Sequence, residues 1–274
     1  MALGGVAYYW SLLERGQSAA QNLDRLFFGE WDVMRREFKE IFTSLFREEG
    51  RYVDIITALG RKKVGMSREE IVRALGGKCG GEISRCLEEL ESCGFIRHYR
   101  SYGNAKKGSL FQLIDCYTLF YFKFLESPHG GGSFWSESCN TPTVNAWRGL
   151  AFERVCLLHI CEIKAALGIA GVQADIYSWQ SGASSAGDRG AQIDLLIDRK
   201  DRMINLCEMK YADGEYELDA NEFAKMLNRR EMFVRRTGTT KGVQMTMVTP
   251  CGLKRNKYWG REQKIVTADD LFKE

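Results

Sequence analysis

The sequence lacks most of the features that assign a protein to a class by themselves. Its 39 lysines and arginines nearly balance 36 aspartates and glutamates, so the net charge of +3 gives no argument for nucleic-acid binding. No apolar run approaches the length of about 18 residues that a membrane helix needs. The first residues also lack the basic segment of a secretory signal. We therefore expect a cytoplasmic chain with no membrane partner.

Cysteine and histidine are present without the spacing of a metal site. The nine cysteines are scattered and odd in number, which indicates reduced thiols rather than a disulfide framework. No CxxC pair occurs, so packing inside helices is a better interpretation than zinc binding. The three histidines, His98, His129 and His159, lie outside any motif, and we expect them to be packed or solvated.

What the chain does have is the composition of a globular protein of two ordinary domains: 274 residues, of which 45% are hydrophobic and 27% charged. Residues 1–50 repeat apolar side chains at helical spacing, which predicts two or three helices with aromatic faces. Because these faces are too apolar to remain in water, we expect the segment to pack on the residues that come after it.

Residues 51–126 show the pattern of a winged helix. A helix over 52–59 is followed by the capping box Ser67 and Glu70, which begins a helix over 68–75. A further helix over 81–93 ends at Gly94, and two strand-like runs, 95–100 and 110–114, form a ribbon. An aromatic helix over 117–125 closes this part of the chain.

Residues 127–145 contain a triple glycine, several serines and two of the three prolines, which predicts an exposed linker. Beyond it, residues 146–274 predict a mixed α/β domain with one helix, three strands, a second helix and further strands. We expect helices over 146–167 and 221–236, and strands over 172–179, 192–198, 203–210, 243–249 and 264–267.

Two acidic residues lie inside apolar strands of this last domain. Asp194 stands in Ile-Asp-Leu-Leu-Ile and Glu208 in Leu-Cys-Glu-Met-Lys, and a hairpin can set the two carboxylates side by side. With the carbonyl of Met209 they would form an oxygen-rich pocket for Mg²⁺ or Mn²⁺, and Lys210 would hold the attacking water or a phosphate. An equally good interpretation is that Asp194 and Glu208 line a solvated sheet face or pair with Lys210 as ions.

With an upstream helical glutamate, Glu153, and the order of helices and strands, these residues resemble the PD-(D/E)XK phosphodiesterase fold, also called restriction-endonuclease-like, with its αβββαβ core. The whole chain is similar to the C-terminal region of prokaryotic AAA-type ATPases, in which lid helices and a winged helix precede such a nuclease-like domain. The stretches that carry the resemblance are Ala2-Leu3-Gly4-Gly5-Val6, Asp24-Arg25-Leu26-Phe27-Phe28, Arg148-Gly149, Phe152-Glu153, Ile193-Asp194 and Glu208-Met209-Lys210.

The resemblance implies that Asp194 and Glu208 bind the metal, that Lys210 serves the nucleophilic water, and that Glu153 adds a further ligand. It also implies an ATPase domain, upstream or in a separate chain, as partner. No G-x-x-x-x-G-K-[ST] loop is present, so we expect no ATPase activity from these residues. The proline of the eponymous motif is missing before Asp194.

Basic residues offer contacts with nucleic acid, DNA in the first place, although the basic residues of the wing are explained at least as well by a solvated hairpin tip. The expected recognition helix is acidic, but the wing carries Arg97, Arg100, Lys106 and Lys107. The helix over 221–236 adds Arg229 and Arg230, with more cations after residue 253. Two functions remain open: a metal-dependent nucleic-acid phosphodiesterase, and a non-catalytic DNA-docking or protein-interaction module that keeps an inactive nuclease-like fold. A second copy of the chain is a further candidate partner.

Overall fold

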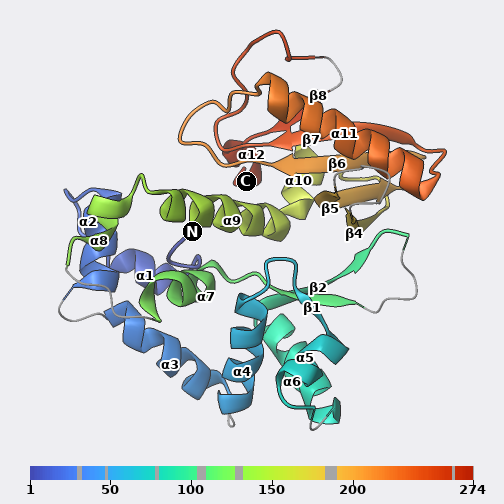
Figure 1. Ribbon diagram of the computed structural model, residues 1–274. Helices are drawn as coiled ribbons and strands as arrows, with labels where there is room; N and C mark the ends of the chain where they lie inside the picture. The colour runs from blue at the N-terminus through green and yellow to red at the C-terminus, as the bar shows by residue number, and fades with distance from the viewer. Residues whose placement is uncertain are drawn as a thin grey trace. The chain divides into compact units, whose positions relative to one another are not determined.

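A computed structural model describes residues 1–29, 33–46, 49–77, 80–103, 109–126, 132–182, 190–260 and 263–273. The chain is mixed α/β and divides into two compact units, and the helices and strands are labelled in Figure 1. Unit 1 comprises Met1–His98 and Leu110–Arg154, and unit 2 comprises Tyr99–Ser109 and Val155–Glu274.

The elements of unit 1 are mainly helices. They are α1 (Ala7–Ser11), α2 (Ala19–Leu23), the π-helical turn η1 (Asp24–Phe28), α3 (Val33–Leu45), α4 (Glu49–Gly60), β1 (Met66–Ser67), α5 (Arg68–Ala74), α6 (Gly80–Ser92), β2 (Ile96–Ser101), β3 (Leu110–Leu113), α7 (Cys116–Phe120), the π-helical turn η2 (Tyr121–Leu125), α8 (Phe134–Ser138) and α9 (Pro142–Leu158). The last residues of β2 and of α9 belong to unit 2.

An aromatic core joins the N-terminal helices of unit 1 to α7 and η2. Phe120 is fully buried, and its ring centroid lies 4.6 Å from that of Phe27 and 5.0 Å from that of Trp147. Phe38 of α3 stacks on Tyr121 with 3.8 Å between centroids. The prediction that the first fifty residues pack on the aromatic helix, rather than forming a core of their own, is therefore confirmed.

The middle of unit 1 follows the predicted order of helices with a ribbon, and it adds a short strand. The capping box is present, because the Ser67 side chain accepts from the Glu70 amide while the Glu70 carboxylate accepts from the Ser67 amide. The added strand β1 pairs antiparallel with β3, which lies between β1 and β2. Gly65 precedes β1 with φ of +87°, and a Cβ there would lie 2.3 Å from the Phe111 carbonyl oxygen.

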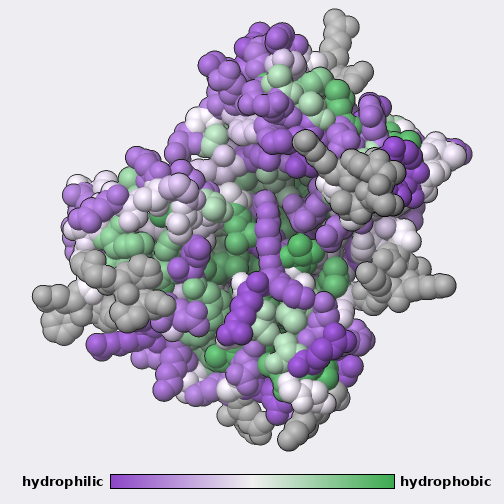
Figure 2. Space-filling model, viewed as in Figure 1, coloured by the Kyte–Doolittle hydropathy of each residue, from purple (hydrophilic) through white to green (hydrophobic). Residues whose placement is uncertain are grey.

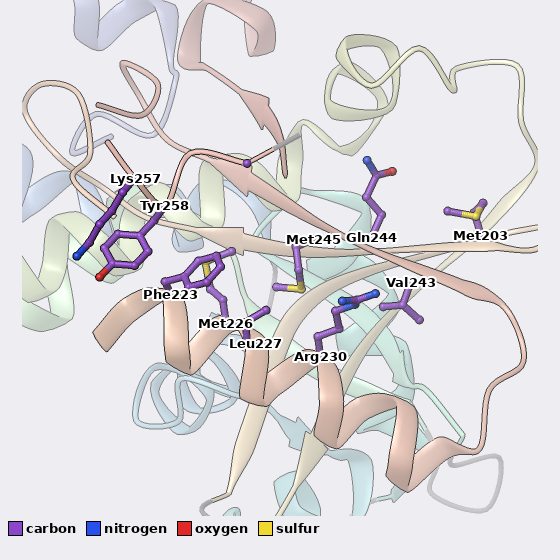
Figure 3. Close-up of a pocket in the computed structure, with 11 residues that line it drawn as sticks. Met203, Phe223, Met226, Leu227, Arg230, Val243, Gln244, Met245, Lys257 and Tyr258 are labelled. Carbon is purple, nitrogen blue, oxygen red and sulfur yellow. The ribbon is translucent and has the colours of Figure 1, made fainter. Parts of the chain in front are cut away.

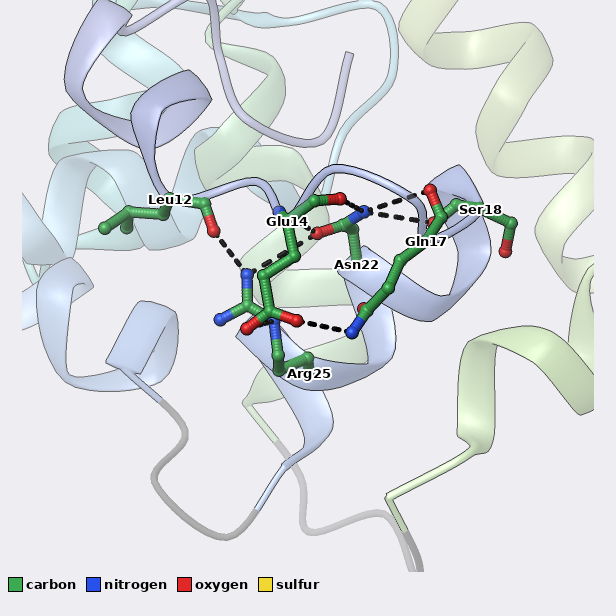
Figure 4. Close-up of polar contacts among 6 residues, drawn as sticks. All are labelled: Leu12, Glu14, Gln17, Ser18, Asn22 and Arg25. Carbon is green, nitrogen blue, oxygen red and sulfur yellow. Dashed lines mark hydrogen bonds and ion pairs between the residues drawn. The ribbon is translucent and has the colours of Figure 1, made fainter.

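Polar contacts fix the segment between α1 and α2 (Figure 4). The buried Asn22 accepts from the Glu14 amide at 2.7 Å and donates to the carbonyls of Glu14 and Ser18. Arg25 donates to the Leu12 carbonyl and forms an ion pair with Glu14 at 3.3 Å. These bonds satisfy a buried amide side chain that would otherwise destabilise the unit.

The predicted linker is wrong only in part, because most of residues 132–145 are exposed as expected, but they include helices and two buried side chains. Residues 127–131, His129 included, lie outside the described residues, but α8 and the start of α9 occupy much of residues 132–145. Trp135 and Val144 are buried, and Asp24 accepts from the amides of Trp135 and Ser136 at the first turn of α8. Glycine and serine content alone does not report this burial. The helix expected over 146–167 also breaks at His159, into α9 and α10 (Ile160–Ala166).

Unit 2 is built on a mixed sheet. Its strands are β4 (Ala174–Ser181), β5 (Ala191–Arg199), β6 (Met203–Met209), β7 (Gly242–Val248) and β8 (Gln263–Val266). Adjacent pairs β4–β5 and β5–β6 are antiparallel, and β6–β7 and β7–β8 are parallel. The end of β2, at Arg100 and Ser101, pairs parallel with β4. The predicted sequence of helix, three strands, helix and strands is thus present.

Helix α11 (Ala220–Thr237) covers one face of this sheet, which we call the α11 face (Figure 1). Met226, Met232 and Phe233 of the helix pack on Trp179 and Leu206 of the strands. The helix begins at the cap Asp219 and ends at Gly238 in the left-handed conformation. The short helix α12 (Ala268–Leu271) contacts α10. On the face drawn in Figure 2, hydrophilic residues dominate the surface and hydrophobic residues are visible among them.

None of the helices in the described part of the chain combines the length and the apolar character that a bilayer crossing requires. The eight cysteines within the described ranges are all free thiols, which agrees with the prediction that the cysteines are reduced; Cys79 lies outside those ranges.

Candidate functional site

A β-bulge in β5 decides where Asp194 points. Tyr177 of β4 pairs with Leu196, whereas Trp179, two residues on, pairs with Ile193, so β5 has one extra residue between these pairs. Ile193 and Leu196 both pack on the α11 face. Since side chains alternate on either side of the bulge, Asp194 lies on the opposite face. There it accepts a hydrogen bond from Gln192, two residues earlier on the same strand, at 2.5 Å.

Glu208 lies on the α11 face, because it alternates with Ile204 and Leu206, which pack there. The Arg229 guanidinium of α11 is 2.8 Å from one Glu208 carboxylate oxygen, and the Lys210 ammonium is 3.1 Å from the other. Lys210 also lies 3.4 Å from Glu222 of α11, which Lys225 contacts at 2.5 Å. We call Glu208, Lys210, Glu222 and Arg229 the ion cluster.

The electrostatics of the ion cluster favour its charged state. Burial lowers the pKa of Lys210, but the neighbouring carboxylates of Glu208 and Glu222 outweigh burial and raise this pKa above its ordinary value. The Lys225 ammonium and the Lys210 ammonium lower the pKa of Glu222 against a smaller opposing effect of burial. Two carboxylates therefore face two cations inside the cluster, and no net charge remains for a metal ion to compensate.

The arrangement does not fit the predicted Mg²⁺ or Mn²⁺ site. Asp194 and Glu208 lie on opposite faces of the sheet, and Arg229 takes the Glu208 oxygen that a metal would use. In the part of the chain that the structure describes, no group of three or more histidine, cysteine, aspartate or glutamate side chains is placed to hold a metal ion. The bulge argues against the expected convergence of Asp194, Glu208 and Lys210, because it changes the face on which Asp194 lies. The metal site itself stays a prediction.

The other two predicted site residues have different surroundings. Met209 ends β6 in register with Val248 of β7, and its side chain is buried. Glu153 belongs to α9 in unit 1, where the Lys63 ammonium is 2.9 Å from its carboxylate. Its role as a further ligand stays a prediction.

Of the predicted nucleic-acid contacts on the wing, the structure gives a side-chain partner for Arg97 alone among the residues that it describes. Arg97 donates to Gln112 at 2.8 Å, and His98 lies 2.5 Å from the Glu91 carboxylate. Arg100 pairs through its backbone with Tyr177 of β4. Lys106 and Lys107 lie outside the described residues.

A pocket of about 480 Å³ lies between α11, β7 and the loop that precedes β8 (Figure 3). Phe223, Met226, Leu227 and Arg230 reach it from the helix, and Val243 and Met245 from the strand. The remaining lining residues are Met203, Gln244, Lys257, Tyr258 and Gly260. Sequence reasoning pointed to the cations of this region but missed the cavity, whose only signal was the pair Tyr258 and Trp259 among basic residues.

Three cations around this pocket are not neutralised by any carboxylate that the structure describes. Arg230 and Lys257 line it, and Arg255 lies 5.8 Å from the centre of the Trp259 ring. Within the described ranges, none of the three forms an ion pair, in contrast to Arg229 and Lys254. The Lys257 ammonium lies 5.1 Å from the centre of the Tyr258 ring, and Trp259 is 42% exposed. This combination of unpaired positive charge and exposed aromatic surface is suited to an anionic ligand with planar groups.

No family model, curated protein or solved structure matches the chain.

Proposed function

We propose that the chain is a non-catalytic nucleic-acid-docking module. In this proposal, residues 51–126 form a winged helix and unit 2 has an inactive PD-(D/E)XK nuclease-like fold. The order α4, β1, α5, α6, β2, β3 supports the winged helix. The two antiparallel and the parallel pairings of β4 to β7, with α11 before β7, support the nuclease-like core. The module would serve an ATPase domain, upstream or in another chain.

The observation that carries the docking function is the set of three cations, Arg230, Arg255 and Lys257, that have no carboxylate partner among the described residues. Arg230 and Lys257 line the pocket, and Arg255 lies over the ring of the exposed Trp259. Unpaired surface cations release the counterions of a phosphate backbone, which is the main source of affinity for nucleic acid. Aromatic side chains interleaved with them add stacking that tolerates any base sequence. The net charge of +3 hides this local arrangement.

The ion cluster supports the non-catalytic part of the proposal. A phosphodiesterase needs a carboxylate pair that is free to bind a metal. Here the Glu208 carboxylate already has two cationic partners, and Asp194 accepts from Gln192 on the other face. Both carboxylates would have to abandon these partners before they could share an ion.

The test is the affinity for fluorescent oligonucleotides, measured by anisotropy over a series of salt concentrations. If all three cations contact phosphates of a single strand, log K should fall against log salt with a slope of about −2. Arg230→Ala, Arg255→Ala and Lys257→Ala should each reduce the steepness by about 0.7. Lys39→Ala, which removes an exposed cation of unit 1, is the control and should leave the slope unchanged. A slope that none of the three variants alters would refute the docking surface.

Metal-dependent phosphodiester cleavage is the second candidate, favoured by the strand order and by the E-x-K sequence of Glu208 and Lys210. Its test is cleavage of labelled DNA with Mg²⁺ or Mn²⁺, together with a calorimetric metal titration. Cleavage by the wild type that is lost in Glu208→Ala and in Lys210→Ala would establish it. Equal cleavage by wild type and Glu208→Ala would indicate a contaminating nuclease, and the docking module would then stand alone.

A further inference from the structure

We infer that the pocket between α11 and β7 takes one unstacked base of a single-stranded nucleic acid. This inference rests on the proposed docking function and adds the class of ligand: a single strand rather than a duplex. Three features of the pocket lead to it: its shape, the chemistry of its walls and the position of the cations around it.

The pocket has the size and the lining of a site for a planar organic group. Its volume of about 480 Å³ lies in the range of small-molecule sites, roughly 300–1,000 Å³. Phe223 and Tyr258 form an aromatic wall with 5.3 Å between ring centroids, and Figure 3 shows the two rings side by side. Met203, Met226 and Met245 supply flexible, polarisable contacts that can adapt to different bases.

The charges lie where the backbone of such a strand would run. Arg230 extends from α11 at the pocket itself, and the exposed Lys257 stands beside the aromatic wall (Figure 3). Arg255 and Trp259 continue the surface next to the lining residues Tyr258 and Gly260. A base inside the pocket would therefore leave its flanking phosphates near two or three cations, and the next base could stack on the exposed indole.

A duplex does not present a free planar base to the pocket. Its bases are paired and stacked, and one enters a pocket only after unpairing that costs a few kcal/mol. A single strand presents bases that are already free to leave the stack. The pocket therefore favours single strands, although its cations attract phosphates of either kind.

Three probes separate the base from the backbone: an oligothymidylate, an abasic oligonucleotide of equal length, and a duplex. The wild-type chain should bind the oligothymidylate about tenfold more tightly than the abasic strand, since one stacked base contributes about that factor or more. Leu227→Trp, which fills the pocket, should abolish this preference, whereas Trp259→Ala, which removes the surface for the next base, should only reduce it. Neither variant should change the affinity for the abasic strand. Because Leu227 is only half-buried and Trp259 is exposed, both variants should fold.

The control is Trp10→Ala, which removes another exposed tryptophan, in α1 of unit 1, and should preserve the preference. Equal affinity for the oligothymidylate and the abasic strand, with a salt slope that still depends on Arg230, would overturn the base pocket and leave the docking function intact. No binding of any probe would overturn both. Labelled oligothymidylate can also be displaced with unlabelled competitors. If an acidic peptide displaces it at a lower concentration than unlabelled oligothymidylate does, the inference is overturned.

Discussion

Replacing Glu208 with glutamine tests whether the ion cluster stabilises unit 2. The substitution keeps the size of the side chain and removes the charge that lies 2.8 Å from Arg229 and 3.1 Å from Lys210. Glu208 is 14% exposed, Arg229 23% and Lys210 30%, so solvent screens these pairs only in part. The remaining cations would share the single carboxylate of Glu222.

The magnitude follows from the two lost contacts. Breaking a buried ion pair costs about 3–5 kcal/mol, and exposed ion pairs contribute about 1 kcal/mol or less. For two half-buried contacts we expect Glu208→Gln to lower the free energy of unfolding by about 2 kcal/mol. A metal centre predicts the opposite sign, because carboxylates gathered without their ion repel one another and gain from neutralisation.

Urea unfolding of the full chain, followed by circular dichroism at low and high salt, measures this change. Glu217→Gln is the matched control, because Glu217 and its partner Lys254 are 62% and 58% exposed and should contribute less than about 0.5 kcal/mol. In the double variant Glu208→Gln with Arg229→Met, part of the loss should be recovered, since the guanidinium that lost its partner is gone as well. Unchanged or higher stability in Glu208→Gln would refute the structural role of the cluster.

Three further predictions concern other parts of the chain. Phe120→Ala should lower the free energy of unfolding by about 3–5 kcal/mol, because Phe120 is fully buried among aromatic rings. The control Phe272→Ala should have little effect, because Phe272 is 66% exposed, and thermal unfolding of both variants checks the difference. The Lys273 side chain and the Thr267 amide lower the pKa of Asp270 from 3.8 to about 2, so its contribution to stability is present above pH 4 and is lost as the pH falls towards 2. Asp270→Asn should therefore lower the melting temperature at pH 7 but not near pH 2. Burial raises the pKa of the Cys116 and Cys207 thiols to about 12, so these thiols should not react with iodoacetamide in the native chain. Mass spectrometry should find them unmodified, whereas the exposed thiols of Cys93, Cys161 and Cys251 should be modified. Modification of Cys207 in the native state would contradict the packing of β6.

The sequence by itself determined the local structure. Helical and alternating apolar periodicities predicted α6, α11 and the central strands within a few residues, since these patterns reflect which side of one element is buried. The capping box at Ser67 predicted the start of α5, because its hydrogen bonds join residues only three apart. Composition missed the short helix at Phe134–Ser138, where burial of Trp135 by distant aromatic rings overrides the preference of glycine and serine for loops.

The tertiary structure alone decided the chemistry of the candidate site. Alternation predicts which residues of one strand share a face, but a single extra residue in β5 reverses the face of Asp194, and the sequence carries no sign of that bulge. The partners of Glu208 are decided in the same way, because Arg229 reaches it only when α11 packs on β6. The pocket is formed by a helix, a strand and a loop that only the packing of unit 2 brings together, so the cavity and the cations around it arise from residues that are ordinary one by one.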